Sequence, residues 1–183
     1  MLFLHKTQNK KMFENNTLDL DQIPQYEEVV FTDLHKDYVK ILQMNAAITL
    51  LIGVIVSVGL YFIFEETEKY YFIAGILLLS VLIGCFPLIT YKKKQYAFRK
   101  HDVLYKKGLI FKSTNIVPYI RLQHVVIKQG WYAKRLELAV LELHTAANDR
   151  VDVAIPGLTL EEAERWKSFL LNRLQELEDG TDV

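Results

Sequence analysis

Two long apolar stretches without a single charge constrain this chain more than any other feature. Residues 41–64 and residues 70–91 contain no Asp, Glu, Lys or Arg. At about 1.5 Å of rise per residue, each stretch is long enough as a helix to cross a hydrocarbon core of roughly 30 Å. A buried helical hairpin in a soluble core is disfavoured, because a chain of 183 residues has too little other surface to enclose both helices. The sequence therefore predicts a membrane protein with two transmembrane helices.

The short link between the stretches and the charges around them predict the topology. Five residues, Glu65-Glu66-Thr67-Glu68-Lys69, leave room only for a tight antiparallel hairpin, so both flanks lie on one side of the membrane. Lys and Arg residues concentrate on cytoplasmic flanks. The link holds one of them, whereas the flanks hold seven: Lys36, Lys40, Lys92, Lys93, Lys94, Arg99 and Lys100. We therefore expect a multi-pass protein of the cytoplasmic cell membrane with both termini in the cytoplasm.

Composition excludes several functional classes. The single cysteine, Cys85, rules out a disulfide within the chain and a cysteine-based metal site. The five histidines are scattered, and no nucleophile, zinc or nucleotide-binding motif is present. His124 and His144 read as strand-surface residues rather than as metal ligands. The sequence therefore predicts no enzyme, no cofactor and no metal.

Charge is sorted along the chain although its total is zero. Residues 92–135 hold twelve Lys and Arg but one acid, Asp102, whereas residues 136–183 hold four basic and eleven acidic residues. The basic segment follows the second apolar stretch directly, so a location beside a membrane accounts for it. Nucleic-acid binding is not expected, because the domain is tethered and lacks a recognised motif.

The chain divides into four parts. Residues 1–37 read as a polar cytoplasmic arm, residues 38–94 as the transmembrane hairpin, residues 95–178 as a globular domain and residues 179–183 as a tail. Within the arm, residues 29–31 have a short strand pattern. Residues 32–40 are expected to extend the first span as a helix, with Thr32 or Asp33 as its cap.

The globular domain begins with short strand patterns. Lys106-Lys107-Gly108 is a turn signal between residues 103–105 and residues 109–111, which predicts a hairpin. Pro118 predicts an edge or a strand end. Three further strands are expected, over residues 125–129, 139–145 and 151–155, and Pro156-Gly157 is expected to end the last of them.

A well-marked helix follows the strands. Thr159 and Glu162 have the spacing of a capping box. Apolar residues then recur three and four apart, on one helix face, to about Leu177: Ala163, Trp166, Leu170, Leu174 and Leu177. The predicted fold is a membrane α-helical hairpin followed by an antiparallel β domain, either a bent sheet or a partly open barrel, capped by a C-terminal α-helix.

Several segments together carry a family resemblance. They are Gly108-Leu109-Ile110-Phe111, Val117-Pro118-Tyr119-Ile120-Arg121-Leu122-Gln123-His124-Val125, Gly130, Arg135, Leu141-Glu142-Leu143-His144-Thr145-Ala146 and Glu161-Glu162-Ala163. With two preceding spans, they resemble the YdbS-like bacterial membrane proteins that carry a bacterial pleckstrin-homology (PH) domain of the second type. The resemblance covers roughly residues 38–177. It departs from the family at Glu137 and Ala147, where members tend to have glycine.

The resemblance implies a PH-like fold, with a bent antiparallel sheet and a capping helix. It also implies a partner, since family members often act with a larger membrane protein that contains related domains. It does not imply phosphoinositide binding, because the PH fold serves many binding roles.

The basic hairpin is the first candidate contact. Lys106, Lys107 and Lys112 surround it, and such a hairpin grips phosphates in lipid-binding PH domains. Each basic residue near an anionic leaflet contributes about 1 kcal/mol. Contact with anionic lipid headgroups is one interpretation, and a solvated turn that obeys the positive-inside bias is the other.

Two further sets are candidates for contact with lipid or a partner. Arg121 and Gln123 are expected to point the same way from one strand. Alternatively, Arg121 caps backbone carbonyls where Pro118 interrupts the sheet. Trp131, with Lys134 and Arg135, either forms an exposed loop or packs under the C-terminal helix with Trp166.

Two functions follow as hypotheses. The first is a membrane-anchored PH-like interaction module, a scaffold or accessory subunit of a bacterial membrane complex. The acidic face of the C-terminal helix would dock its partner: Glu161, Glu162, Glu164 and Glu176. The alternative is a sensor of anionic lipid headgroups. A transporter or channel part is disfavoured, because neither span carries a charge that would mark a pathway.

Overall fold

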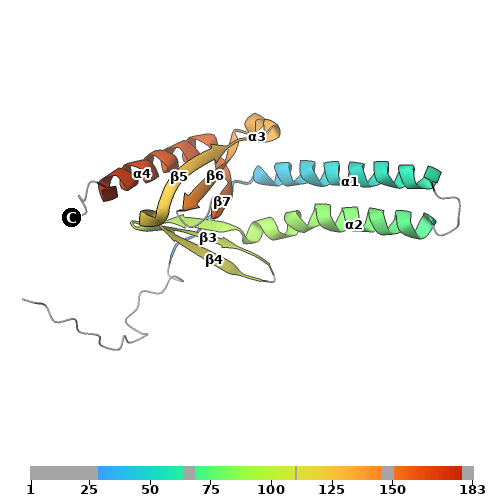
Figure 1. The fold of residues 1–183 in the computed structure, drawn as a ribbon, viewed down its shortest axis with the longest axis horizontal. Coiled ribbons are helices and arrows are strands. Elements are labelled where there is room, and N and C mark those ends of the chain that lie inside the picture. Colours follow the sequence, from blue (N-terminus) through green and yellow to red (C-terminus); the bar gives the residue numbers. More distant parts are fainter. Residues whose placement is uncertain (1–28, 64–68, 110, 146–150, 179–183) are drawn as a thin grey trace, which may run out of the picture.

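The computed structural model of the chain describes residues 29–63, 69–109, 111–145 and 151–178 (Figure 1). Two long helices, α1 (Tyr38–Ile63) and α2 (Lys69–Thr90), lie side by side and project from a domain of strands (Figure 1). Both are long and apolar enough to cross a membrane, which confirms the two predicted helices. The predicted tight link between them lies outside the described residues.

Small residues hold α1 and α2 together. A Cβ atom added to Gly53 of α1 would lie 2.1 Å from Ser80 Oγ of α2, and one added to Gly84 would lie 3.3 Å from Ala46 Cα. Such contacts let two helix backbones approach closely in lipid. Large apolar residues instead point outward: Leu51, Phe62 and Leu82 are each more than half exposed. The helix pair thus has a thin, small-residue interior and an apolar outer surface.

The domain contains two antiparallel sheets that do not close into a barrel. The first has the order β1 (Thr32–Asp33), β2 (Gln95–Phe98), β3 (Asp102–Lys107) and β4 (Ser113–Pro118). The second has the order β5 (Leu122–Lys128), β6 (Leu138–Thr145) and β7 (Val153–Thr159). Short helical turns connect the parts: η3 (Tyr91–Lys93), η4 (Tyr119–Arg121) and α3 (Trp131–Arg135).

Strand β1 comes before the spans, whereas its partner β2 comes after them. Thr32 pairs with Tyr96 and Asp33 with Gln95, and the Gln95 side chain donates a hydrogen bond to Asp33 Oδ1 at 2.8 Å. The prediction of a helix over residues 32–40 is therefore wrong at its start, because pairing with β2 holds residues 32–33 extended. Leu34 joins the domain core. The helical hairpin is thus inserted between two neighbouring strands of one sheet.

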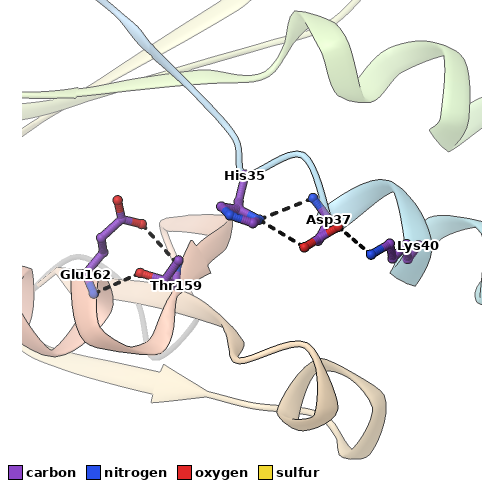
Figure 2. A network of polar contacts seen from close by, with 5 residues as sticks. All are labelled: His35, Asp37, Lys40, Thr159 and Glu162. Atoms are coloured by element: carbon purple, nitrogen blue, oxygen red, sulfur yellow. Dashed lines mark hydrogen bonds and ion pairs between the residues drawn. The ribbon is translucent and has the colours of Figure 1, made fainter.

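Contacts at the start of α1 join it to the domain (Figure 2). The His35 backbone N–H donates to the Gly157 carbonyl of β7 at 2.9 Å. Asp37 forms an ion pair with Lys40 at 2.6 Å, and its backbone N–H donates to His35 Nδ1 at 3.2 Å (Figure 2). Gly157 has a φ of +69°, and a Cβ there would lie 3.0 Å from Tyr38 Cβ. The first turn of α1 therefore packs directly on the last strand.

Helix α4 (Leu160–Glu178) covers the core. Its cap is the predicted capping box: Thr159 N–H donates to Glu162 Oε2 at 3.0 Å, and Glu162 N–H donates to Thr159 Oγ1 at 3.2 Å (Figure 2). Trp166 stacks on Phe98 with ring centroids 3.9 Å apart. The fully buried members of the core include Val103, Leu141, Leu143, Ile155, Leu158, Ala163 and Leu170. This arrangement confirms the expected antiparallel domain closed by one C-terminal helix.

Two strand predictions differ from the structure. Residues 109–111 were expected as the second strand of the first hairpin, but β4 begins at Ser113, where it pairs with Lys107. Gly108, with a φ of +108°, turns the chain, and a Cβ there would lie 1.9 Å from the Phe111 carbonyl oxygen. Pro156 and Gly157 do not end β7, which continues to Thr159 because Leu158 and Thr159 still pair with β6.

Candidate functional site at the end of the domain that faces the helices

The turn of the β3–β4 hairpin carries exposed apolar residues. We call residues 108, 109, 111 and 112 the tip. Phe111 is 88% exposed and Leu109 is 38% exposed. The β3–β4 hairpin extends toward the side of the domain from which α1 and α2 project, and it lies below the C-terminal end of α2 (Figure 1). Exposed apolar side chains on a turn next to an apolar helix are typical of a membrane-contacting surface.

A groove between α2 and the tip shows how far the tip reaches. Phe86, Pro87 and Thr90 of α2 form one wall, and Leu109 and Phe111 form the other. Phe86 precedes the last residue of α2 by four positions, which is about 6 Å along a helix. The tip therefore lies level with the last turn of the apolar helix and not beyond it.

Lysines surround this apolar tip. Lys107 and Lys112 are exposed. The ammonium of Lys106 lies 5.4 Å from the centre of the Phe31 ring. Lys94, which follows α2, lies at the same groove as Lys107. Burial lowers the pKa of Lys94, and the positive charge of Lys107 lowers that pKa further.

Helix α3 forms a second aromatic and basic element, beside α1 (Figure 1). A groove of about 340 Å³ lies between them and is lined by Met44 and Asn45 of α1 and by Trp131. Trp131 is 67% exposed, and Lys134 and Arg135 follow it on the surface. Trp131 therefore does not pack with Trp166 under the C-terminal helix. The two apolar helices thus leave the domain between two exposed aromatic elements.

The structure separates Arg121 and Gln123 from this end. Arg121 lies in the turn η4, and Gln123 is the irregular position of β5 between Leu122 and His124, so they do not share one regular strand. Both lie where β4 passes into β5, at the end of the domain far from α1 and α2 (Figure 1). The Arg121 side chain makes no hydrogen bond within the described part of the chain, so the predicted capping of carbonyls is not seen there.

His124 and His144 are neighbours across β5 and β6. Their rings stack at 4.3 Å. Glu142 Oε2 lies 3.7 Å from His144 Nε2 and 2.9 Å from Lys128 Nζ, although this oxygen has no hydrogen bond of good geometry among the described residues. No group of three potential metal ligands occurs within the described residues. The pair lies on strands, as the sequence predicts.

The acidic face of α4 is largely neutralised by its own helix. Glu161 pairs with Arg165 at 2.6 Å, and Glu176 pairs with Arg173 at 2.5 Å. The carboxylate of Glu162 serves the capping box. Glu164 is the acid of this set for which the described residues provide no partner. The face is therefore a less negative surface than the sequence predicts.

The end that faces the helices thus combines groups that suit a lipid–water interface. Its aromatic rings are amphipathic or apolar, and its ammonium groups suit phosphate. As candidate contacts of this end, the sequence analysis named Lys106, Lys107, Lys112, Trp131, Lys134 and Arg135. It did not propose a contact for Lys94, Leu109 or Phe111. The available signal was a run of apolar residues between lysines directly after Gly108.

Comparisons with known proteins agree with the fold. The bacterial PH domain family model matches residues 41–176. The UPF0699 transmembrane protein YdbS of Bacillus subtilis (strain 168) is 31% identical over 140 residues, which cover 73% of this chain and 83% of that protein. The bacterial PH domain family and the YdbS family are not enzyme families. No solved structure matches the chain. The chain is therefore a membrane protein that belongs to the bacterial PH domain family and to the family of transmembrane protein YdbS.

Proposed function

We propose that this protein is a multi-pass component of the bacterial cytoplasmic membrane whose PH-like domain contacts anionic lipid headgroups at the cytoplasmic leaflet. Both termini would lie in the cytoplasm, where the Lys and Arg residues around the spans favour them. One observation carries the proposal: the lysine-flanked tip lies level with the last turn of α2. If α2 spans the bilayer, the tip must enter the headgroup layer.

The insertion of the helices into the sheet supports this placement. Because β1 and β2 pair across the spans and α1 begins against Gly157, the domain is attached at two points. A domain attached in this way has little freedom to turn away from the leaflet. The basic tip and α3 then stay on the membrane side without a separate binding step.

The energetics favour contact over a merely solvated turn. Lys106, Lys107 and Lys112 would each contribute about 1 kcal/mol beside an anionic leaflet. Burial of the exposed Phe111 ring in the interface adds a hydrophobic contribution. These favourable contributions have to exceed only the entropic cost of ordering the tip, because the spans already hold the domain at the membrane surface.

The test uses the full-length protein in lipid nanodiscs. A polarity-sensitive dye is placed at the tip by Phe111→Cys in a Cys85→Ala background, and a matched dye at the far end by Ile120→Cys. The proposal expects the dye at position 111 to report a more apolar environment as phosphatidylglycerol replaces phosphatidylcholine. Salt, or replacement of the three lysines by glutamine, should reverse this change. Identical responses at positions 111 and 120 would contradict leaflet contact.

A specific observation also favours the scaffold hypothesis. At the end of the domain far from the helices, a groove of about 460 Å³ is lined by Ile116, Arg121 and Asp152. Strand β4 is the outer strand of its sheet in the described order, and Ile120 is 75% exposed. An outer strand with exposed apolar side chains accepts an extended segment of a partner. The partner would be a second membrane protein, including one with related PH-like domains.

Crosslinking in membranes separates the two functions. A photoreactive side chain at position 120 should capture a membrane protein, and Ile116→Ser should reduce the yield if β4 forms the contact. The same group at position 111 should capture lipid. Capture of the same protein from both positions would contradict the assignment of the tip to lipid.

A further inference from the structure

The groove between α2 and the tip has the chemistry of a binding site for one lipid. Its volume is about 520 Å³, within the range of roughly 300–1,000 Å³ that small-molecule sites occupy. Phe86, Pro87, Leu109 and Phe111 give it apolar walls. One wall is the end of an apolar helix, so a lipid that lies beside this helix would adjoin the groove.

Two lysines lie at this groove with no acid among its lining residues. Lys94 comes from the segment after α2, and Lys107 comes from the end of β3. Burial disfavours the charge of Lys94 and the positive charge of Lys107 disfavours it further, which is why the pKa of Lys94 is lowered. An anion at this groove would favour the charged form of Lys94 and offset the repulsion from Lys107. A phosphate diester provides that charge.

The groove differs from the general basic surface of the hairpin. Lys106 lies over the Phe31 ring, and neither Lys106 nor Lys112 lines the groove. The groove pair, Lys94 and Lys107, is therefore distinct from Lys106 and Lys112, which lie outside the groove. Only the groove pair adjoins apolar walls that fit an acyl chain.

We propose that this groove binds one anionic phospholipid molecule, with its phosphate between Lys94 and Lys107 and an acyl chain along Phe86, Leu109 and Phe111. The site is too small for a whole lipid, so the rest of the chains would continue along α2. This inference rests on the proposed leaflet contact, because the lipid must enter from the headgroup layer. It adds a defined ligand, a stoichiometry of one and a preference for a lipid over a soluble phosphate.

Native mass spectrometry of the full-length protein in detergent tests the site directly. Phosphatidylglycerol, phosphatidylcholine and glycerol 3-phosphate are titrated as separate probes. We expect one retained phosphatidylglycerol at the lowest concentrations, a weaker phosphatidylcholine adduct and no glycerol 3-phosphate adduct. Retention of glycerol 3-phosphate as strong as that of the lipid would overturn the acyl-chain part of the proposal.

Matched double variants locate the bound lipid. Lys94→Gln with Lys107→Gln should weaken phosphatidylglycerol retention roughly 25-fold, because each lysine contributes about a factor of five. Lys106→Gln with Lys112→Gln removes the same charge outside the groove and should change retention less than about twofold. Leu109→Ser with Phe111→Ser alters only the exposed tip, so it tests the apolar wall without affecting the folded core.

The outcomes separate this inference from the proposed function. Equal losses in the two lysine variants, or no loss in either, would overturn the groove site, while the dye at position 111 would still report leaflet contact. A dye at position 111 with no lipid-dependent change would instead contradict leaflet contact, and with it the entry of the lipid into the groove from the headgroup layer. Thermal unfolding of each variant confirms that the comparison is made on folded protein.

Discussion

The helix pair and the PH-like domain use apolar residues in opposite ways. In α1 and α2, the buried positions are mostly small residues, such as Ala46, Gly53, Ser80 and Gly84, with Leu42 as the large one, while most other leucine, isoleucine and phenylalanine side chains lie outside. In the domain, Leu141, Leu143 and Ile155 are completely buried. Water drives large apolar side chains inward, whereas lipid exerts no such force between helices. The two regions are therefore built for two different solvents within one chain.

The largest expected effect is the loss of a core side chain in the domain. Leu143→Ala should lower the free energy of unfolding by about 2–5 kcal/mol, because it leaves a cavity in a fully buried site. Leu82→Ala, on α2 where the side chain is 59% exposed, should change it by less than about 0.5 kcal/mol. Denaturant unfolding in detergent, followed by tryptophan fluorescence, measures both. Equal losses of unfolding free energy in the two variants would contradict the contrast between the domain and the helix pair, since Leu82 would then belong to a packed interior.

A smaller effect is expected from filling the thin interior of the helix pair. Gly53→Ala should destabilise the pair by about 1–3 kcal/mol, because the added methyl would meet Ser80 Oγ and Cβ at 2.1 and 2.8 Å. Gly59→Ala is the matched control, because nothing lies within 4 Å of its added Cβ. Thermal loss of helical circular dichroism in detergent compares the two. A more stable Gly53→Ala protein would show that α1 and α2 are not closely packed there.

The N-terminal cap of α4 tests the same comparison between the helix pair and the domain, because α4 begins at a surface exposed to water. Thr159→Ala should cost about 1 kcal/mol, because it removes the acceptor of the Glu162 N–H. Ser168→Ala, on the exposed face of the same helix, serves as the control and should be near neutral. Chemical unfolding in detergent measures the difference between them. A neutral Thr159→Ala would mean that the capping box does not contribute to the stability of the domain.

The smallest expected effect is a pH dependence confined to the domain. Asp152 accepts hydrogen bonds from the Thr145 hydroxyl at 2.5 Å and from the Thr145 N–H at 2.8 Å, and these bonds lower its pKa below 3.8. A lowered carboxyl pKa stabilises the folded state above the unfolded pKa, and this stabilisation is lost as the pH falls through the folded pKa.

Asp152→Asn should therefore lower the melting temperature near pH 7. The difference from the native protein should shrink toward about pH 3, where the native carboxyl is also becoming protonated. Thr145→Val, which removes the hydroxyl donor, should raise the pKa of Asp152 and reduce the same difference. A difference that stays constant with pH would mean that the Asp152 charge does not contribute.

Local patterns predicted a large part of the fold. The two apolar helices, the capping box at Thr159 and the strand end at Pro118 all follow from residues near one another in the sequence, and the structure places them as predicted. The errors fall where tertiary contacts override local pattern. Residues 109–111 look like a strand in the sequence, but Leu109 and Phe111 lie outside the strands, because Lys107 pairs with Ser113.

Only the basic residues of the candidate site could be predicted from the sequence. Lys106, Lys107 and Lys112 are visible as a basic hairpin in the sequence. That Lys94 joins Lys107 at one groove depends on how α2 ends against the hairpin. The separation of Arg121 from the basic end likewise depends on the crossing from one sheet to the other.

The sequence by itself determined that this chain enters a membrane and carries a β domain with a C-terminal helix. Apolar length, strand alternation and helix caps are properties of contiguous residues, so no partner is needed to read them. Only the tertiary structure decided that the helices are inserted within the sheet. The hydrogen bond from Gln95 to Asp33 joins residues 62 positions apart, and a two-residue strand has no pattern of its own. Its conformation comes from its partner, which lies beyond the membrane helices in the chain.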